Sequence, residues 1–491
     1  MASQRPNIIF IMSDDHAAHA MSCYQERNGR PAINRTPNLD RIANEGMLFD
    51  SCFCTNSICT PSRAAILAGT YNHVNGVTTL ATMMDNSLPT FPKMLQQGGY
   101  QTAIFGKWHL GQGQKHCPTG FDDWAVLPGQ GYYHNPTFSF KGPGGGYKKT
   151  VPGYVTDIIT DMCLDWLEDR DPEKPFCLLC HHKAPHRPWY SDEKHADMFL
   201  NEDVPEPETL LDNYSGRAKA AEAATMRVGV HMTRTDMKCE MPDEMSEDDL
   251  RRWGYQRYIK EYLRVVQSVD DNVGRLLDYL DREGLAENTL IIYTSDQGFF
   301  LGDHGWYDKR FMYEESLKMP FVLRYPPEVK AGSVNDDIVL NVDFPALFLD
   351  VAGVPVPDHF QGRSFRPLLQ GSTPPDWRQA MYYRYWMNRA HHNVAAHYGI
   401  RTHKYKLIYY YYDGCDQKGT EHGAEGGMQQ TLDIEGLEPE WELFDLENDP
   451  FEMHNLIDDP AYADVVRELK DELHRLQDEV GDERYYQDVS Q

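Results

Sequence analysis

The sequence predicts an α/β fold: a large, mixed and mostly parallel sheet flanked by helices, then a smaller C-terminal α+β domain of antiparallel sheet and helix. Three observations predict it. Several apolar runs lack the alternation of a half-solvated strand, which is typical of central parallel strands. Helical patterns separate these runs, as in layered α/β proteins. A turn-rich cluster at residues 371–375 precedes a region with a different pattern.

Four apolar runs rich in β-branched residues account for the centre of the predicted sheet: residues 7–12, 102–105, 176–180 and 290–294. The third run contains Cys177 and Cys180, a CxxC pair. Because no second CxxC occurs and the run is apolar, a buried strand is favoured over a metal or redox site. Ten cysteines in 491 residues also fall short of a disulfide scaffold.

Helices are predicted at residues 61–67 and 262–280, where the second pattern repeats apolar residues at spacings of three and four. The turn-rich cluster divides the chain into a domain at 1–372 and a C-terminal subdomain at 373–491. The subdomain is predicted to hold strands at 380–385 and 404–412 and a helix at 461–480. Insertions are predicted from irregular composition at 142–146, 191–249 and 413–430.

The composition excludes several classes of partner. The formal net charge is −28, from 47 basic and 75 acidic residues, which argues against nucleic acid and anionic membranes. No apolar run is long enough to span a membrane. Only Met1 to Arg5 precede the first apolar run, which predicts a cytoplasmic protein; a periplasmic or secreted location is the alternative if an export signal has been trimmed.

Ionisable or amide side chains follow each of the four central strands. Ligands bind beyond the carboxyl ends of strands in open α/β sheets, so these residues are predicted to meet. They are Asp14 and Asp15, Lys107 and His109, Lys183 and His186, and Asp296 and Gln297.

Three carboxylates and an amide among them form a candidate metal site. Asp14, Asp15, Asp296 and Gln297 offer only oxygen ligands, which suit hard divalent cations. One divalent ion is predicted, with Ca²⁺ expected and Mg²⁺ as the alternative. Taken alone, Asp14-Asp15 would be interpreted as a loop or a helix cap rather than as a metal site.

Cys59 starts the most informative stretch, Cys59-Thr-Pro-Ser-Arg63. The proline suits the first turn of a helix, so Cys59 is predicted to lie near a helix N-terminus, where anions are stabilised. On spacing alone, a buried structural cysteine near a helix start is an equal alternative.

CTPSRAAILAG at residues 59–69 resembles the signature of the formylglycine-dependent type I sulfatase family, within the alkaline-phosphatase-like superfamily. Further motifs follow in the family's order: RPNIIFIMSDD at 5–15, FGKWHLG at 105–111, KAPHRP at 183–188, SDQGFFLGDHGWYDKR at 295–310 and ELFDLENDPFEMHNL at 442–456. The resemblance implies an alkaline-phosphatase-like fold, sulfate ester hydrolysis and a maturation enzyme that oxidises Cys59 to formylglycine. Gln297 stands where the family usually has Asn.

The resemblance also implies the chemistry of the nucleophile. A hydrated aldehyde at position 59, which also serves as a metal ligand, can attack sulfur with one hydroxyl and expel sulfate with the other. Arg63 would stabilise this group and the metal shell. Lys107 and Lys309 would hold the sulfate oxygens where charge sits in the transition state.

Three histidines receive roles from the same resemblance. His186 is the predicted general acid for the leaving alkoxide, and His109 the base or partner of the hydrated aldehyde. His304 is a candidate substrate contact, with a structural role as an equal alternative.

The substrate is predicted to be a small sulfated compound, and a carbohydrate is favoured. Residues 308–326 and 392–407 are similar to segments of carbohydrate sulfatases, including those acting on glucosamine-type sugars. Phosphonate monoester and phosphodiester hydrolases of the same superfamily are the nearest alternative. A non-catalytic binder of sulfated glycans is a second one, against which the intact set of site residues argues.

Overall fold

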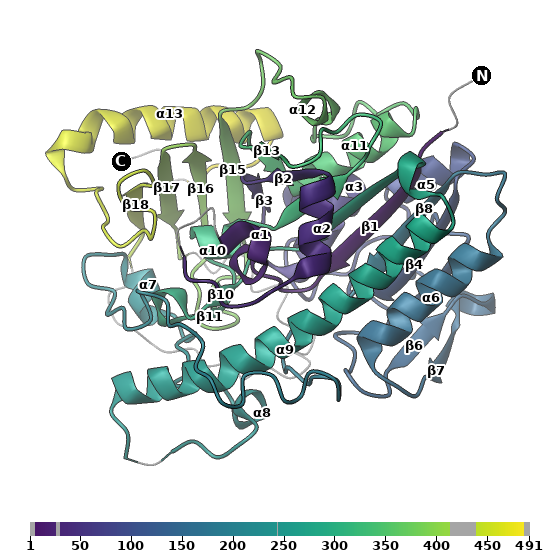
Figure 1. The fold of residues 1–491 in the computed structure, drawn as a ribbon. Helices are drawn as coiled ribbons and strands as arrows, with labels where there is room; N and C mark the ends of the chain where they lie inside the picture. Colours follow the sequence, from purple (N-terminus) through teal and green to yellow (C-terminus); the bar gives the residue numbers. More distant parts are fainter. Residues whose placement is uncertain (1–4, 26–29, 243, 413–437, 486–491) are drawn as a thin grey trace.

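The computed structural model describes residues 5–25, 30–242, 244–412 and 438–485. A ten-stranded sheet forms the core of the molecule (Figure 1). Its strands, in spatial order, are β13 (Ser333–Asn335), β2 (Met47–Phe49), β12 (Phe321–Arg324), β9 (Thr289–Ser295), β1 (Asn7–Ser13), β8 (Phe176–His181), β4 (Gln101–Lys107), β5 (Asp123–Leu127), β6 (Thr137–Phe140) and β7 (Tyr147–Thr150).

The four predicted apolar runs are confirmed as the adjacent strands β9, β1, β8 and β4, and all of them run parallel. Their registers pair Ser13 with Ser295 and Gly106 with His181, so the four strands end at one edge of the sheet. Within β8, Cys177 and Cys180 are both fully buried, and their side chains belong to different apolar clusters. The strand interpretation of the CxxC pair is therefore confirmed.

Helices cover both faces of the sheet, because alternate residues of the buried strands contribute to two different cores. Ile8 and Phe10 belong to one apolar cluster, and Ile9 and Ile11 to the other. The first core includes residues of α3 (Cys59–Ala68), α5 (Phe91–Gln97) and α11 (Phe344–Val351), and the second includes those of α2 (Pro37–Glu45), α6 (Val155–Asp169) and α9 (Glu247–Arg282). The long teal helix α9 crosses the molecule in Figure 1.

The rest of the regular structure before the C-terminal sheet consists of short strands and short helices. Two pairs of short strands lie outside the main sheet: β3 (Cys52–Phe53) with β14 (Val339–Leu340), and β10 (Phe300–Leu301) with β11 (Tyr307–Asp308). The short helices are α1 (Ser22–Gln25), α4 (Asn72–Asn75), α7 (Lys219–Ala223), α8 (Arg234–Met237), α10 (Glu314–Leu317) and α12 (Arg366–Leu369).

The predicted C-terminal antiparallel sheet and helix are confirmed. The sheet is formed in order by β15 (Ala380–Tyr385), β16 (His397–Thr402), β17 (Tyr405–Tyr410) and β18 (Glu440–Asp445), and α13 (Ala463–Val480) packs against it. Buried residues of this sheet belong to the same apolar cluster as α3 and α11. Because one core runs through both parts, the domain boundary at 372 stays a prediction.

The predicted insertions differ in their structure. Residues 142–146 hold a 3₁₀ turn that links β6 to β7. Residues 191–249 are mostly irregular and carry α7, α8 and the start of α9. The insertion predicted at 413–430 lies outside the described residues. Among the helices described, none is both long and apolar enough to cross a membrane.

Candidate active site

The four predicted metal ligands meet at the carboxyl ends of β1 and β9. The backbone N–H of Asp15 donates to Asp296 Oδ1 at 3.2 Å, and Gln297 Nε2 donates to Asp15 Oδ1 at 2.5 Å. Asp14, Asp15, Asp296 and Gln297 are all fully buried. The parallel pairing of the two strands thus brings together residues about 280 positions apart in the chain.

The chemistry of this cluster fits a cation. One oxygen from each of three side chains is buried without a hydrogen-bond partner: Asp14 Oδ1, Asp15 Oδ2 and Gln297 Oε1. Burial raises the pKa of Asp15 to about 7, and burial together with Asp14 raises the pKa of Asp296 to about 6. Buried carboxylates that repel one another and leave oxygens unsatisfied are what a divalent ion would stabilise.

His186 joins the same cluster from the loop after β8. Its Nε2 lies 3.7 Å from Asp15 Oδ2, and Asp14, Asp15 and His186 each offer a ligand atom within 4.8 Å of the others. Its Nδ1 lies 2.6 Å from the carbonyl oxygen of Arg187, which fixes the ring. Both oxygens of Asp296 accept hydrogen bonds, from Asp15 and Arg63. His186 is therefore placed either to ligate a cation or to protonate a group beside it.

The prediction that Cys59 lies near a helix N-terminus is confirmed: it is the first residue of α3, which begins two residues before the predicted helix, and it is 1 % exposed. Burial raises the pKa of its thiol, so at neutral pH the unmodified side chain is not a thiolate. Ser62, in the first turn, donates to the carbonyl oxygen of Asp296, and Asn341 Nδ2 donates to Ser62 Oγ at 2.9 Å. These contacts fix the start of α3 against the end of β9.

Arg63 extends from α3 to the cluster of predicted metal ligands. Its Nε donates to Asp296 Oδ2 at 2.9 Å, and its Nη1 donates to the carbonyl oxygen of Lys107 at 2.9 Å. The side chain is 2 % exposed, so the pair is fully desolvated. Removing one partner of such a pair leaves a buried charge without compensation, which typically costs about 3–5 kcal/mol.

The two predicted sulfate-binding lysines each contact a carboxylate of the cluster. Lys107 pairs with Asp14, and Lys309 pairs with Asp15. Lys107 also donates to Gln130 Oε1 at 2.6 Å, and Gln130 was not among the predicted site residues. Burial alone would raise the pKa of Asp14, but Lys107 and the neighbouring cations hold it well below its usual range.

His109 lies beside the first turn of α3. Its Nδ1 lies 3.3 Å from Thr60 Oγ1, and its carbonyl oxygen accepts from the same hydroxyl at 3.0 Å. Burial lowers the pKa of His109 well below its usual range, with Lys107 adding to the effect. The imidazole is therefore neutral at physiological pH, and it lies beside Thr60, the residue that follows Cys59.

His304 was predicted as a substrate contact, with a structural role as the equal alternative; among the described residues it has no hydrogen bond or ion pair to this cluster. It is fully buried, and its Nδ1 accepts from Arg217 Nη1 at 2.9 Å. Asp212 Oδ2 lies 3.4 Å from the same nitrogen, and Glu315 Oε2 lies 3.5 Å from Nε2. With both ring nitrogens facing protein groups, the structural alternative fits its surroundings.

Three polar residues near Lys309 were not singled out from the sequence. Asp308 Oδ2 lies 3.3 Å from His392 Nε2, and Asp308 Oδ1 lies 3.3 Å from Arg310 Nη2. Arg310 is 5 % exposed, and its Nε and Nη1 have no hydrogen-bond partner. The signal was present, because residues 308–310 open a segment similar to carbohydrate sulfatases, but the prediction used Lys309 alone.

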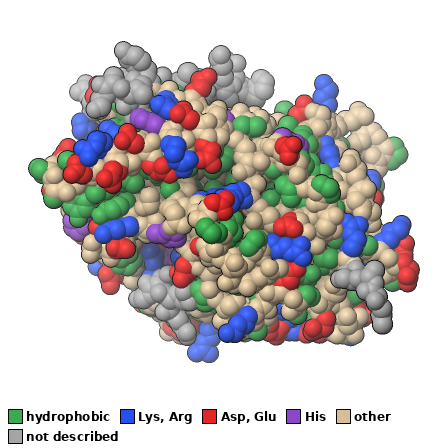
Figure 2. Space-filling view, turned by 90° about the horizontal axis from the view of Figure 1, so that it is seen from above, with side chains coloured by type: hydrophobic (Ala, Val, Ile, Leu, Met, Phe, Trp, Pro, Cys, Tyr) green, Lys and Arg blue, Asp and Glu red, His purple; other side chains and the backbone are tan. Residues whose placement is uncertain are grey.

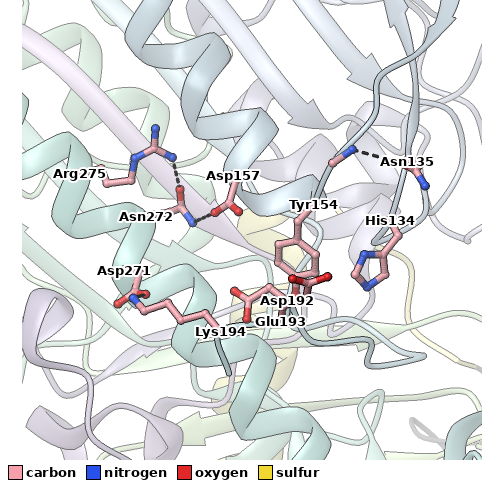
Figure 3. Close-up of a pocket in the computed structure, with 11 residues that line it drawn as sticks. His134, Asn135, Tyr154, Asp157, Asp192, Glu193, Lys194, Asp271, Asn272 and Arg275 are labelled. Carbon is pink, nitrogen blue, oxygen red and sulfur yellow. Dashed lines mark hydrogen bonds and ion pairs between the residues drawn. The ribbon is translucent and has the colours of Figure 1, made fainter. Parts of the chain in front are cut away.

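A surface cavity of about 660 Å³ lies elsewhere, between α6, α9 and the loop after β8 (Figure 3). Its walls include His134, Tyr154, Asp157 and Asp271, and it contains none of the predicted site residues. The acidic and basic side chains around it largely pair with one another, as Lys194 does with Asp271. Figure 2 shows the same mixture of charges across another face of the molecule.

Comparison with known proteins places this geometry in a family. The sulfatase family model matches residues 6–354. A second model, for the C-terminal part of N-sulphoglucosamine sulphohydrolase, matches residues 302–418 and 435–479.

Individual relatives are similar over most of their length. An N-acetylglucosamine-6-O-sulfatase of Bacteroides thetaiotaomicron is 43 % identical, over 98 % of this chain and 88 % of that protein. The human N-acetylglucosamine-6-sulfatase is 28 % identical, over 78 % of this chain and 68 % of its own.

Solved structures show the same fold. One protein in complex with its substrate D-glucosamine-2-N,6-O-disulfate superposes with a TM-score of 0.87 and 42 % identity, covering 97 % of this chain and 98 % of its own. A phosphonate monoester hydrolase of Agrobacterium radiobacter has a TM-score of 0.73 at 21 % identity, over 97 % of this chain and 96 % of its own, and shares the fold.

Proposed function

The chain belongs to the sulfatase family, and from that premise we propose that it removes the 6-O-sulfate group of a glucosamine-type sugar. Membership makes it a sulfuric ester hydrolase. The observation that carries the sugar assignment is the nearly full-length similarity to an N-acetylglucosamine-6-O-sulfatase. The similarity to a structure that holds a 6-O-sulfated glucosamine supports it.

Cys59 supplies the nucleophile after conversion to formylglycine, by a maturation enzyme that acts on the CTPSR motif. A hydrated aldehyde supplies two hydroxyls on one carbon, one to attack sulfur and one to expel sulfate after losing its proton. The raised pKa of the Cys59 thiol supports this, because an unmodified cysteine would be a protonated and poor nucleophile. Neutral His109, beside Thr60, would take the proton.

The cation is Ca²⁺, held by Asp14, Asp15, Asp296 and Gln297. Their oxygen-only donor set and the three unpartnered oxygens support this choice over zinc, which favours nitrogen and sulfur. When bound, the ion supplies positive charge beside the sulfate group. Arg63 holds Asp296 in place for it.

Lys107, Lys309 and His186 act on the ester itself. The two lysines hold sulfate oxygens, and His186 Nε2 protonates the leaving sugar oxygen. The bond from Nδ1 to the Arg187 carbonyl leaves Nε2 facing the centre. Burial lowers the pKa of His186, with Asp14 opposing and Lys107 adding to the effect; the negative charge of a bound sulfate ester favours its protonated form.

The sugar ring would contact Asp308, Arg310 and His392. The unpartnered Nε and Nη1 of Arg310 are donors for ring hydroxyls, and Asp308 is an acceptor between Arg310 and His392. A site built to hydrogen-bond hydroxyls rejects analogues that lack them, because its buried polar groups are then unpaired.

A panel of monosulfated sugars tests the proposal. Sulfate release should be fastest from 6-O-sulfated N-acetylglucosamine, and slower from the 2-N-, 3-O- and galactose-6-sulfated compounds. A phenyl phosphonate ester serves as the comparison for the phosphonate hydrolase alternative. A higher kcat/KM for the phosphonate than for every sulfated sugar would overturn the proposed function.

A further inference from the structure

Lys183 is a buried cation beside the reaction centre to which the proposed mechanism gives no task. It follows the last residue of β8 by two positions and precedes His186 by three, and it is 1 % exposed. Its Nζ donates to the carbonyl oxygen of Arg187 at 3.5 Å and lies 4.8 Å from the ring centre of Tyr133. Among the described residues it has no carboxylate within ion-pair distance.

The other cations of the centre each contact a carboxylate. Lys107 pairs with Asp14, Lys309 with Asp15, and Arg63 with Asp296. The charges of the two predicted sulfate-binding lysines are therefore largely compensated before substrate arrives. An incoming sulfate ester adds a negative charge to a desolvated site.

The charge of Lys183, unlike the charges of these three cations, is not compensated by a carboxylate in the described part of the chain. A buried ammonium without a counter-charge is costly, and proteins meet the cost by neutralising the group or by supplying an anion. Burial lowers the pKa of Lys183 to about 7, and Lys107 adds to the effect while Asp14 and Asp15 oppose it. The carbonyl of Arg187 and the face of Tyr133 hold the amine in place and attract its charged form without carrying a full negative charge.

We propose that Lys183 is a sulfate-binding residue, whose ammonium supplies the counter-charge for the sulfate group of the substrate. This rests on the proposed function, since it assumes a sulfate ester as the ligand. Lys183 shares the acceptor Arg187 O with His186 Nδ1, which ties it to the predicted general acid. Tyr133 donates from its hydroxyl to the carbonyl oxygen of His186 at 2.7 Å, so the three side chains form one unit.

Two variants separate charge from shape. Lys183→Gln keeps a donor for the Arg187 carbonyl and removes the charge, and Lys183→Met removes both. The matched control is Lys194→Met, because Lys194 is a solvent-exposed lysine paired with Asp271 in the cavity of Figure 3. Inorganic sulfate is the probe, added to metal-loaded, mature enzyme. Its affinity is measured by calorimetry and by inhibition of nitrophenyl sulfate hydrolysis.

Both Lys183 variants should bind sulfate about ten- to a hundredfold more weakly, as expected for the loss of a charged hydrogen bond. KM for sulfate esters should rise by a similar factor, with the same change for sugar and nitrophenyl leaving groups. Lys194→Met should match the wild type. Thermal unfolding checks that the variants fold, and Lys183→Gln decides the outcome if Lys183→Met does not fold.

If Lys183 has only a structural role, its replacement should leave the affinity of the folded enzyme for sulfate unchanged. If Lys183→Gln binds sulfate as tightly as the wild type does, the proposal fails while the proposed function stands. If the wild type hydrolyses no sulfate ester, the proposed function fails first, and this inference fails with it. For a result independent of substitution, sulfate should protect Lys183 of the wild type against carbamylation and leave Lys194 unprotected; equal modification of Lys183 with and without sulfate contradicts the proposal.

Discussion

Replacing His186 with alanine should separate substrates by how much their leaving groups need a proton. A sugar alkoxide is a poor leaving group that needs protonation, whereas nitrophenolate leaves without it. His186 Nε2 lies 3.7 Å from Asp15 Oδ2, and the side chain is 11 % exposed, so it can reach an ester bound beside the predicted metal ligands. General acid catalysis typically contributes about 10²–10⁴ in rate, or roughly 3–5 kcal/mol of transition-state stabilisation.

His186→Ala should therefore lower kcat for 6-O-sulfated N-acetylglucosamine by about 10²–10⁴, and for nitrophenyl sulfate by less than about tenfold. His109→Ala is the matched control: its ring lies beside Thr60 at the start of α3, so its loss should affect both substrates alike. Initial rates of both substrates across pH provide the measurement. Equal losses on the two substrates in His186→Ala would remove His186 from the acid role and favour metal ligation instead.

Three further predictions concern other parts of the site. Active enzyme should carry formylglycine at Cys59, detectable by peptide mass and a hydrazide probe; Cys59→Ala should abolish hydrolysis, and Cys59→Ser should accumulate a sulfated enzyme. Because the pKa values of Asp15 and Asp296 are raised to about 7 and 6, the metal-free site holds protons that Ca²⁺ displaces. Calorimetry of Ca²⁺ binding in buffers of different ionisation enthalpy should show proton release at about pH 6 and almost none above about pH 8. Proton release that does not change with pH would contradict this assignment. His304→Ala should remove the ring nitrogen that accepts from the buried Arg217 Nη1 and lower thermal stability, consistent with roughly 1–3 kcal/mol for a buried polar contact, with KM unchanged in the folded fraction; a raised KM at full stability would favour the substrate-contact role.

Strand order explains why the sequence predicted so much of the site. The apolar runs that became β1, β4, β8 and β9 are buried on both faces, so their hydrophobicity was continuous and easy to recognise. Parallel strands end at the same edge of a sheet, so the proximity of Asp14 and Asp296 could be predicted from the strands alone. The helix start at Cys59 was equally local, because proline and the following polar residues mark it.

Contacts made by loops and by strands without a continuous apolar pattern were harder to predict. Gln130 was missed because nothing local marks a loop residue that will accept a hydrogen bond from Lys107. β16 was missed because polar and small residues interrupt it, although all but its last residue are buried against neighbouring strands. The surroundings of His304 were hard to predict for the same reason: its partners Arg217 and Asp212 come from the irregular segment before α9, whose packing has no periodic signal.

The acidic surface and the anionic substrate can be reconciled by burial. The net charge of −28 acts through solvent, where salt screens it within about 8–10 Å. Inside the site, Asp14, Asp15 and Asp296 pair with three buried cations, Lys107, Lys309 and Arg63. A divalent ion therefore leaves a positive excess where water cannot screen it. Capture of the substrate should thus depend on short-range contacts with buried cations rather than on long-range steering. Added salt should accordingly change kcat/KM for a monosulfated sugar only weakly, apart from competition when the added anion is sulfate.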